Sequence, residues 1–323
     1  MMADKTTALS LYSTMLRIRM VEEKIVELYP EQEMRCPVHL YIGQEAIAAG
    51  VCAHLSEKDY LMSNHRSHGH YLAKGGSLRA MFAEIYGKAA GCSKGKGGSM
   101  HLVDLDVGIM GTTPIVAGSI PVAVGVAFGS VLKGEDRITV AFFGDAATEE
   151  GVFCESLNFA ALKKLPVLFV CENNYFSVYS PLSVRQPAER DNLALVKAYG
   201  IAGERGDGNN VLEVYRATGK AVQYLRNGKG PYYLEFDTYR WREHCGPNYD
   251  NDLGYRTEEE FLRWRHRCPA DNFERYLIKE GYTTPGKVVK IKKKISREID
   301  EAVTFAKQCP FPDAGDAFID VYA

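Results

Sequence analysis

The stretch Gly144–Asn174, GDAATEEGVFCESLNFAALKKLPVLFVCENN, follows one apolar run and contains a second one near its end. One run covers Ile138–Phe143, just before it, and the other covers Val167–Cys171, near its end. Between the runs, apolar residues recur at helical spacing over Glu149–Lys164. The order strand, helix, strand predicts a right-handed crossover, which makes the two strands parallel. We therefore expect an α/β fold in which a parallel sheet is flanked by helices.

Polar residues close both predicted strands, because Asp145 follows the first and Asn174 follows the second. The carboxyl ends of parallel strands meet at one edge of a sheet, where ligands of open α/β sheets bind. A carboxylate and an amide oxygen suit Mg²⁺, and phosphate and water complete its shell. The small residues Gly144, Ala146 and Ala147 leave backbone amides that can face a phosphate near a helix start. The pattern predicts a magnesium–diphosphate site, although an ordinary βαβ unit with a turn Asp and a turn Asn fits the spacing equally well.

The same stretch resembles the thiamine diphosphate motif, which begins with Gly-Asp-Gly and ends with Asn-Asn. From about Leu9 to Arg256, the sequence is similar to the alpha subunit of 2-oxo acid dehydrogenases of the pyruvate and acetoin dehydrogenase type. Ala146 stands where the family usually has a second glycine, and its methyl group is compatible with the site if the local φ is negative. The resemblance implies one large thiamine diphosphate-binding domain over residues 1–323, in which residues 257–323 form a helical C-terminal extension.

The resemblance also implies the cofactors thiamine diphosphate and Mg²⁺. Asp145, Asn174 and the backbone carbonyl of Phe176 match the metal ligands of the family. Arg66 can offer a planar fork to the diphosphate, and Val116 matches a bulky position that holds the cofactor bent. The residues that match cofactor contacts are His65, Arg66, Val116, Gly144, Asp145, Ala146, Ala147, Asn174 and His244.

Histidines from three segments are the catalytic candidates. His39 precedes a helix that we expect to begin at Gly43, and His65 lies in the run NHRSHGH, where the family has an aromatic residue. His244 lies in the run RWREHC. A lone histidine is more often structural than catalytic. The resemblance, however, places a histidine facing the substrate at 39 and one over the diphosphate at 244. We therefore expect His39, His65 and His244 to take part in proton transfer and carboxylate recognition.

Two loops depart from known phosphate-binding or family patterns. The Gly- and Lys-rich run at 91–101, GCSKGKGGSMH, lacks Walker spacing, and we expect it to shape the site through its backbone. After the matching Arg240, Arg242 and Glu243 replace a His-Gly pair of the family. Cys245 replaces the serine that is phosphorylated in animal mitochondrial members, so we expect no such regulation. The changed loop leaves the substrate open.

Composition places the chain among soluble globular proteins. The 323 residues are 46% hydrophobic and 25% charged, and the net charge of −2 gives no bulk attraction to nucleic acid or to an anionic membrane. The eight cysteines include no C-x-x-C pair and are typical of reduced thiols. No signal peptide or membrane-spanning run is apparent, so we expect a cytoplasmic protein.

Thiamine catalysis requires a glutamic acid beside the aminopyrimidine ring, which in this family belongs to a separate beta chain. The resemblance therefore implies a heterotetramer of two alpha and two beta chains that oxidatively decarboxylates a pyruvate-like or acetoin-like substrate. The acyl group would pass to lipoamide on a dihydrolipoyl acyltransferase. A decarboxylase or carboligase that does not use lipoamide is the alternative, and a non-catalytic scaffold paralogue is a further one. A nicotinamide-dependent enzyme is disfavoured because no G-x-G-x-x-G opens a helix in the expected context.

Overall fold

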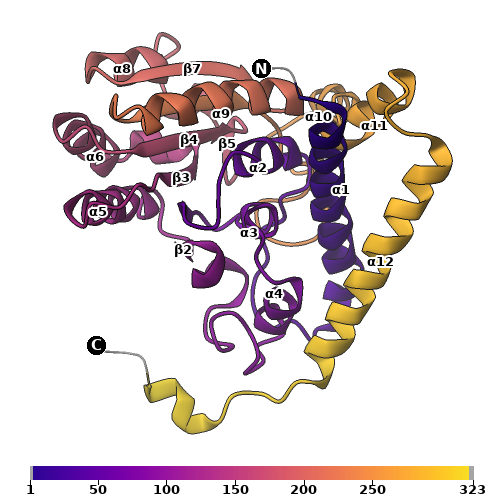
Figure 1. Cartoon of the computed structure of the whole chain (residues 1–323). Coiled ribbons are helices and arrows are strands. Elements are labelled where there is room, and N and C mark those ends of the chain that lie inside the picture. The colour runs from indigo at the N-terminus through magenta and orange to yellow at the C-terminus, as the bar shows by residue number, and fades with distance from the viewer. Residues whose placement is uncertain (1–2, 320–323) are drawn as a thin grey trace.

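The computed structural model of the chain describes residues 3–319, and a parallel sheet lies at its centre (Figure 1). Six strands pair in the order β2–β1–β3–β4–β8–β7, and every pairing between neighbours is parallel. The expected α/β fold with a parallel sheet flanked by helices is confirmed. The six strands are β1 (Tyr60–Ser63), β2 (Ile109–Thr112), β3 (Thr139–Gly144), β4 (Val167–Asn173), β7 (Ala202–Asp207) and β8 (Tyr232–Asp237).

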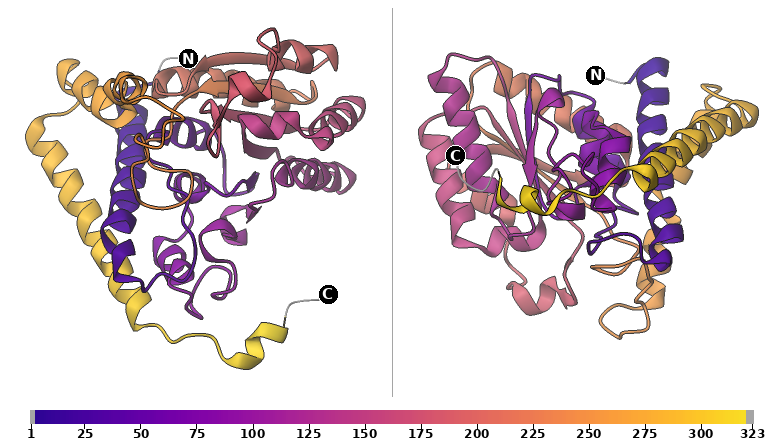
Figure 2. Two further views of the ribbon diagram at one scale, coloured as in Figure 1. Left: turned by 180° about the vertical axis from the view of Figure 1, so that it is seen from behind. Right: turned by 90° about the horizontal axis from the view of Figure 1, so that it is seen from below.

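Helices cover both faces of this sheet (Figure 2). Helices α5 and α6 lie on one face, and α2 and α9 lie on the other, with α1 outside them. A small antiparallel pair, β5 (Phe176–Ser177) and β6 (Ser180–Pro181), follows β4. The α-helices are α1 (Lys5–Leu28), α2 (Glu45–Cys52), α3 (His68–Lys74), α4 (Leu78–Ile85), α5 (Ser119–Leu132), α6 (Gly151–Leu162), α7 (Leu182–Arg185), α8 (Asn192–Ala198), α9 (Val211–Arg226), α10 (Glu258–His266), α11 (Pro269–Lys279) and α12 (Pro285–Gln308).

The central strands are apolar on both faces, because each face is covered by helices. In β3, Val140 and Phe142 belong to the core shared with α1 and α2, whereas Ala141 and Phe143 belong to the core shared with α5 and α6. This alternation is the period of two that a strand imposes on its side chains. Burial of both faces explains why the strand reads as a continuous apolar run in the sequence.

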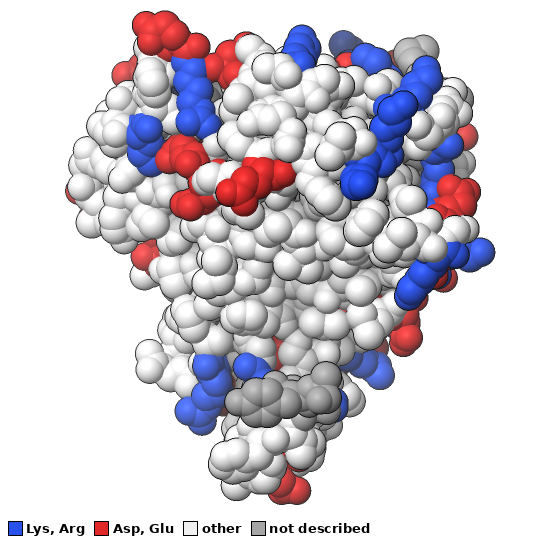
Figure 3. All heavy atoms as spheres, turned by 90° about the vertical axis from the view of Figure 1, so that its left-hand side faces the viewer, with Lys and Arg blue, Asp and Glu red and all other residues white. Residues whose placement is uncertain are grey.

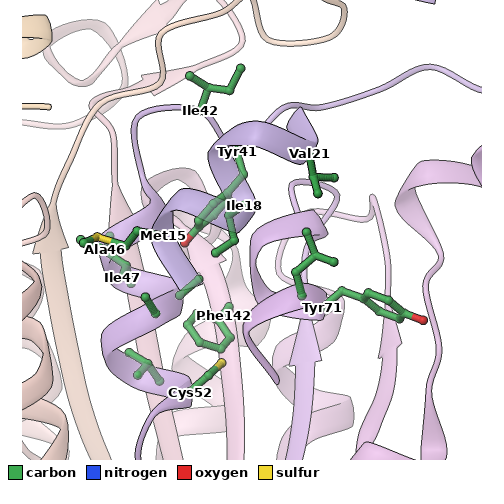
Figure 4. Close-up of a cluster of buried hydrophobic side chains, with 14 of the residues drawn as sticks. Met15, Ile18, Val21, Tyr41, Ile42, Ala46, Ile47, Cys52, Tyr71 and Phe142 are labelled. Carbon is green, nitrogen blue, oxygen red and sulfur yellow. The ribbon is translucent and has the colours of Figure 1, made fainter. Parts of the chain in front are cut away.

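The core between the sheet and α1 is built from side chains far apart in the sequence (Figure 4). Met15 and Ile18 of α1 and Ile47 of α2 are fully buried, as is Phe142 of β3. The segment just before α2 adds Tyr41, which is also fully buried. This packing fixes the segment that carries His39 against the sheet, so the position of that histidine depends on the core.

The C-terminal helices pack along the outside of this core. Helix α12 runs beside α4 and α1, and α11 contacts α1 (Figure 1). Arg17 of α1 and Glu298 of α12 form an ion pair of 2.7 Å between Nη2 and Oε1. No helix of the described residues is both long enough and apolar enough to cross a membrane.

Glu84, at the end of α4, organises the loop at 91–101. Its carboxylate accepts N–H groups from Ser93 (2.7 Å), Gly95 (2.9 Å), Gly97 (2.7 Å) and Gly98 (3.0 Å). A carboxylate that accepts several backbone amides is well satisfied, even when it is buried. These amides point at a side chain of the chain itself, which agrees with a backbone-shaping role for this loop.

Two local expectations need correction. The helix expected from Gly43 begins at Glu45, because Gly43 has a φ of +103° and forms a turn. A Cβ at this position would lie 2.3 Å from the carbonyl oxygen of Tyr239, so only glycine fits between the two segments. The run GDGNN at 206–210, expected as a turn, contributes its first two residues to the end of β7.

Candidate active site

A cavity of about 280 Å³ opens at the carboxyl edge of β3 and β4. This is the edge at which the sequence places a ligand site. The structure brings together, on the wall of this cavity, each residue predicted for the site: His39, His65, Arg66, Val116, Gly144, Asp145, Ala146, Ala147, Asn174, Phe176 and His244. Their individual roles stay predictions, but their convergence follows from the fold.

Three oxygen donors lie on one side of the cavity. Asp145 opens the 3₁₀ turn that follows β3, and its carboxylate is buried. The side-chain oxygen of Asn174 accepts the N–H of Phe176 at 3.2 Å, and an amide oxygen has a second lone pair. Phe176 is paired with Pro181 in the β5–β6 ladder, and proline has no N–H to donate to the Phe176 carbonyl. A carboxylate, an amide oxygen and a carbonyl form a donor set that fits Mg²⁺.

The backbone around the cavity adopts unusual conformations. Ala117, Tyr175 and Val178 have φ values of 60°, 69° and 53°, in the left-handed region that is uncommon outside glycine. Ala146 is outside that region, so its methyl group does not strain the turn after β3. Residues held in strained conformations cluster at ligand sites, where the surrounding structure enforces them. Of the six non-glycine residues with positive φ in the described part of the chain, Ala117 and Val178 line this cavity.

Arg66 joins two segments of the cavity wall. Its guanidinium donates to the carbonyls of Leu40 (2.7 Å) and His244 (3.2 Å). Burial and the nearby Arg240 lower the pKa of Arg66 to about 10, so it remains charged near neutral pH. A buried cation that faces the cavity favours an anion such as a diphosphate or a substrate carboxylate.

The three predicted histidines meet in the cavity. Their ring centroids are 4.7 Å apart for His39 and His65, 5.0 Å for His39 and His244, and 5.2 Å for His65 and His244. Burial, followed by Arg66, lowers their pKa values to about 2, 3 and 3 for His39, His65 and His244 respectively. His39 is 7% exposed, and its Nδ1 has no hydrogen-bond partner among the described residues. Neutral imidazoles with a free ring nitrogen can hydrogen-bond to a bound molecule.

Acid is expected to destabilise the chain through these histidines. Their pKa values lie below the ordinary value of about 6.5, so the unfolded chain binds protons that the folded chain does not bind. Stability is therefore retained above pH 6.5 and falls as the pH drops below it, by at most about 1.4 kcal/mol per pH unit for each histidine.

Urea unfolding of the chain at pH 7.5 and pH 5.5 measures this loss. His65→Tyr should reduce the difference between the two pH values, whereas the same change at the exposed His101 should leave it unchanged. An equal pH dependence in His65→Tyr and the unaltered chain would contradict the expectation.

The loop that carries His244 is held by its own ion pairs. Asp250 pairs with Arg256 and lies 3.5 Å from Nη1 of Arg240. Arg256 also donates to the carbonyls of Arg240 (2.8 Å) and Trp241 (3.0 Å). At the other end of the loop, the N–H of Gly246 donates to Val38 at 2.8 Å. These bonds place His244 beside His39.

Five polar residues of the cavity wall were not predicted from the sequence: Gln44, Asn64, Ser119, Glu172 and Ser177. Glu172 lines the cavity from β4, where its carboxylate accepts the hydroxyl of Tyr41 and lies 3.0 Å from Nε2 of His70. The side chain of Gln44 accepts a 3.1 Å hydrogen bond from Asn174. An acidic residue directly after an apolar run was the available signal for Glu172; Gln44 offered none.

The fold and the cavity define the class: an α/β protein whose ligand site lies at the carboxyl edge of a parallel sheet. The chain belongs to the dehydrogenase E1 component family, whose model matches residues 13–315. It is an alpha-type subunit of the first component of 2-oxo acid dehydrogenases, and these oxidoreductases depend on thiamine diphosphate, with Mg²⁺ as the usual metal. The resemblance stated from the sequence is confirmed.

Relatives match over nearly the whole chain. The alpha subunit of an acetoin:2,6-dichlorophenolindophenol oxidoreductase from Bacillus subtilis (strain 168) is 41% identical over 318 residues, which are 98% of this chain and 93% of that protein. The alpha subunit of a pyruvate dehydrogenase E1 component from Rhizobium meliloti (strain 1021) is 36% identical over 319 residues, or 98% of this chain and 90% of that one.

Proposed function

We propose that this chain, with a beta-type partner, oxidatively cleaves a small pyruvate-like or acetoin-like substrate and passes the acyl group to lipoamide. The observation that carries the proposal is the convergence of Asp145, Asn174 and Phe176 with the histidine cluster in one cavity. We assign the predicted range 1–323 to a single thiamine diphosphate-binding domain with a helical extension over 257–323; of this range, residues 1, 2 and 320–323 lie outside the described residues. The relatives with acetoin and pyruvate in their names support a substrate of this size.

The cavity residues have distinct proposed roles. When bound, thiamine diphosphate supplies the electron sink for cleavage of a bond beside a carbonyl group. Asp145, Asn174 and the Phe176 carbonyl hold Mg²⁺. Arg66 and His244 bind the diphosphate, the backbone of residues 144–147 faces it, and Val116 and His65 contact the rest of the cofactor. His39, with its unpartnered Nδ1, accepts a proton from the substrate or returns one to it.

The proposal includes a partner chain over the cavity. At about 280 Å³, the cavity lies just below the usual range for small-molecule sites, and Ile115 and Val116 at its rim are 68% and 47% exposed. Helices α5 and α6 run from the cavity edge of the sheet toward its opposite edge, and they present exposed apolar side chains along the way: Val122, Val131, Leu132, Phe159 and Leu162. The side of the molecule seen in Figure 3 carries few charges across its centre. These features support a beta-type chain as the missing wall, in a heterotetramer of two alpha and two beta chains.

The test is a substrate panel with the chain and its co-expressed beta partner, with Mg²⁺ and thiamine diphosphate. Reduction of 2,6-dichlorophenolindophenol is followed with pyruvate, a branched 2-oxo acid and acetoin, and CO₂ release is measured in parallel. We expect turnover with pyruvate or acetoin that exceeds turnover with the branched acid. CO₂ release distinguishes turnover of pyruvate from turnover of acetoin, because only the 2-oxo acid loses its carboxyl group. No turnover with any of them, despite bound cofactor, would contradict the proposal.

A second candidate is a decarboxylase or carboligase that does not use lipoamide. Its motive is the departure from the family pattern at His65, which lines the cavity, and in the loop that begins at Arg242, whose side chain points away from the cavity wall. This side chain donates to Glu23 (3.0 Å) and Pro247 (3.1 Å), and its guanidinium lies 4.0 Å from the ring centroid of Tyr249. Acyl transfer to added lipoamide distinguishes the candidates: a complex that decarboxylates a 2-oxo acid but acylates no lipoamide would favour the second.

A further inference from the structure

The carboxylate of Asp145 has one side-chain partner among the described residues, and that partner is Arg185. Nη2 of Arg185 binds Oδ2 of Asp145, and Nη1 binds Oε1 of Glu149. The side chains of Arg185 and Asp145 are 11% and 2% exposed, so this ion pair is shielded from water. A buried carboxylate held at one oxygen has a fixed orientation, because its second oxygen can turn only if the ion pair breaks.

The guanidinium is itself held from three sides. Nε of Arg185 donates to the carbonyl of Ser180 at 3.1 Å, which anchors it to β6. Glu149 also accepts Nε2 of Gln186 at 2.7 Å, so the acceptor of Nη1 is fixed as well. A planar fork with separate partners for each nitrogen is rigid, which an ammonium group in the same place would not be.

Arg185 also connects the two segments that supply the metal ligands. Asp145 belongs to the turn after β3, whereas Asn174 and Phe176 lead into the β5–β6 pair that ends in α7. The ion pair between Arg185 and Asp145 joins the second segment to the first. The distance between the carboxylate and the Phe176 carbonyl therefore depends on Arg185.

We propose that Arg185 is a positioning residue of the Mg²⁺ site: it binds Oδ2 of Asp145 and thereby presents Oδ1 to the metal. This inference rests on the proposed metal site. It assigns Arg185 no contact with substrate or cofactor. Groups that orient a metal ligand in this way typically change metal affinity by roughly 10- to 100-fold when they are removed.

The experiment measures Mn²⁺ binding to the chain in the presence of thiamine diphosphate, by electron paramagnetic resonance of free Mn²⁺. Arg185→Ala should raise the Kd by roughly 10- to 100-fold. Arg185→Lys should recover only part of the loss, because it keeps the charge without the fork. In the complex with the beta chain, the Mg²⁺ concentration for half-maximal activity should rise, with kcat restored at saturating Mg²⁺.

Arg190 provides the matched control. It donates to the carbonyl of Thr148 in the same turn and touches neither carboxylate, so Arg190→Ala should leave the Mn²⁺ affinity unchanged. An unchanged or tighter Kd in Arg185→Ala would overturn the inference, and a tighter one would mean that Arg185 competes with the metal. Asp145→Ala distinguishes a failure of the Arg185 inference from a failure of the proposed metal site. If it loses Mn²⁺ while Arg185→Ala does not, only the inference fails. If it retains Mn²⁺, the metal site itself is wrong.

Discussion

Asp145→Ala is expected to abolish the Mg²⁺-dependent retention of thiamine diphosphate. The substitution removes the only charged group among the three proposed metal donors, and Glu149, the other carboxylate of the same turn, is already bound by Arg185 and Gln186. The affinity for Mg²⁺ should fall by more than the roughly 100-fold typical for loss of a residue that merely supports a ligand. Cofactor content after gel filtration in Mg²⁺, measured by its absorbance or by mass, gives the result directly.

Controls separate metal binding from folding. Burial raises the pKa of Asp145 while Arg185 opposes that rise, and removal of the carboxylate leaves Arg185 without its partner. Asp145→Asn keeps the shape and removes the charge, so it should lose Mg²⁺ with less loss of stability. The same change at Asp136, whose side chain is 94% exposed, should affect neither property. Normal cofactor occupancy in a folded Asp145→Ala variant would show that the metal assignment is wrong.

The purified chain alone is expected to show no turnover, even at high Mg²⁺ and thiamine diphosphate. Within this chain, Glu172 is the best candidate for the acid that is needed beside the aminopyrimidine ring, because it lines the cavity beside Asn174. Its oxygen Oε1 is engaged by Tyr41 and His70, however, which fixes it to the buried side of the cavity wall. We therefore propose that a separate chain supplies the acid. General acid–base groups contribute about 10²- to 10⁴-fold to rates, so addition of the beta partner should raise turnover by at least that factor.

A titration of the chain with its beta partner, followed by reduction of an artificial electron acceptor, measures the effect. Activity should rise with the beta chain until the two are equimolar. Turnover by the chain alone would contradict the expectation, and loss of that turnover in Glu172→Gln would identify Glu172 as the acid. Cofactor binding without turnover in the complete complex would favour the scaffold alternative.

The sequence predicted the parts of the fold that depend on short-range patterns. The apolar runs before Asp145 and before Asn174 are β3 and β4, and the helical spacing between them is α6. Right-handed crossover then placed Asp145 and Asn174 at one edge, without reference to any relative. Periodicity succeeded here because both faces of the sheet are buried.

The rest of the cavity could not be predicted from spacing. His39, His65 and His244 come from three segments, and their meeting depends on how α2, α3 and the loop after β8 pack. Only the family resemblance brought them together. Arg185 was missed because the segment that brings it to Asp145 contains β5 and β6, and strands of two residues leave no periodic pattern in the sequence. Glu172 was missed because an acidic residue at a strand end also fits a solvent-exposed turn.

The glycine turn before α2 sets limits for the directed evolution of substrate range. Gly43 leaves no space toward Tyr239, and the next segment donates the N–H of Trp241 to Ile42 at 3.1 Å. A side chain at position 43 would push the loop that carries His244 away from His39. Mutational libraries are therefore better placed at the open rim, at Ile115, whose side chain is 68% exposed and has no proposed contact with the cofactor. Position 43 tolerates no diversity, although it touches no substrate.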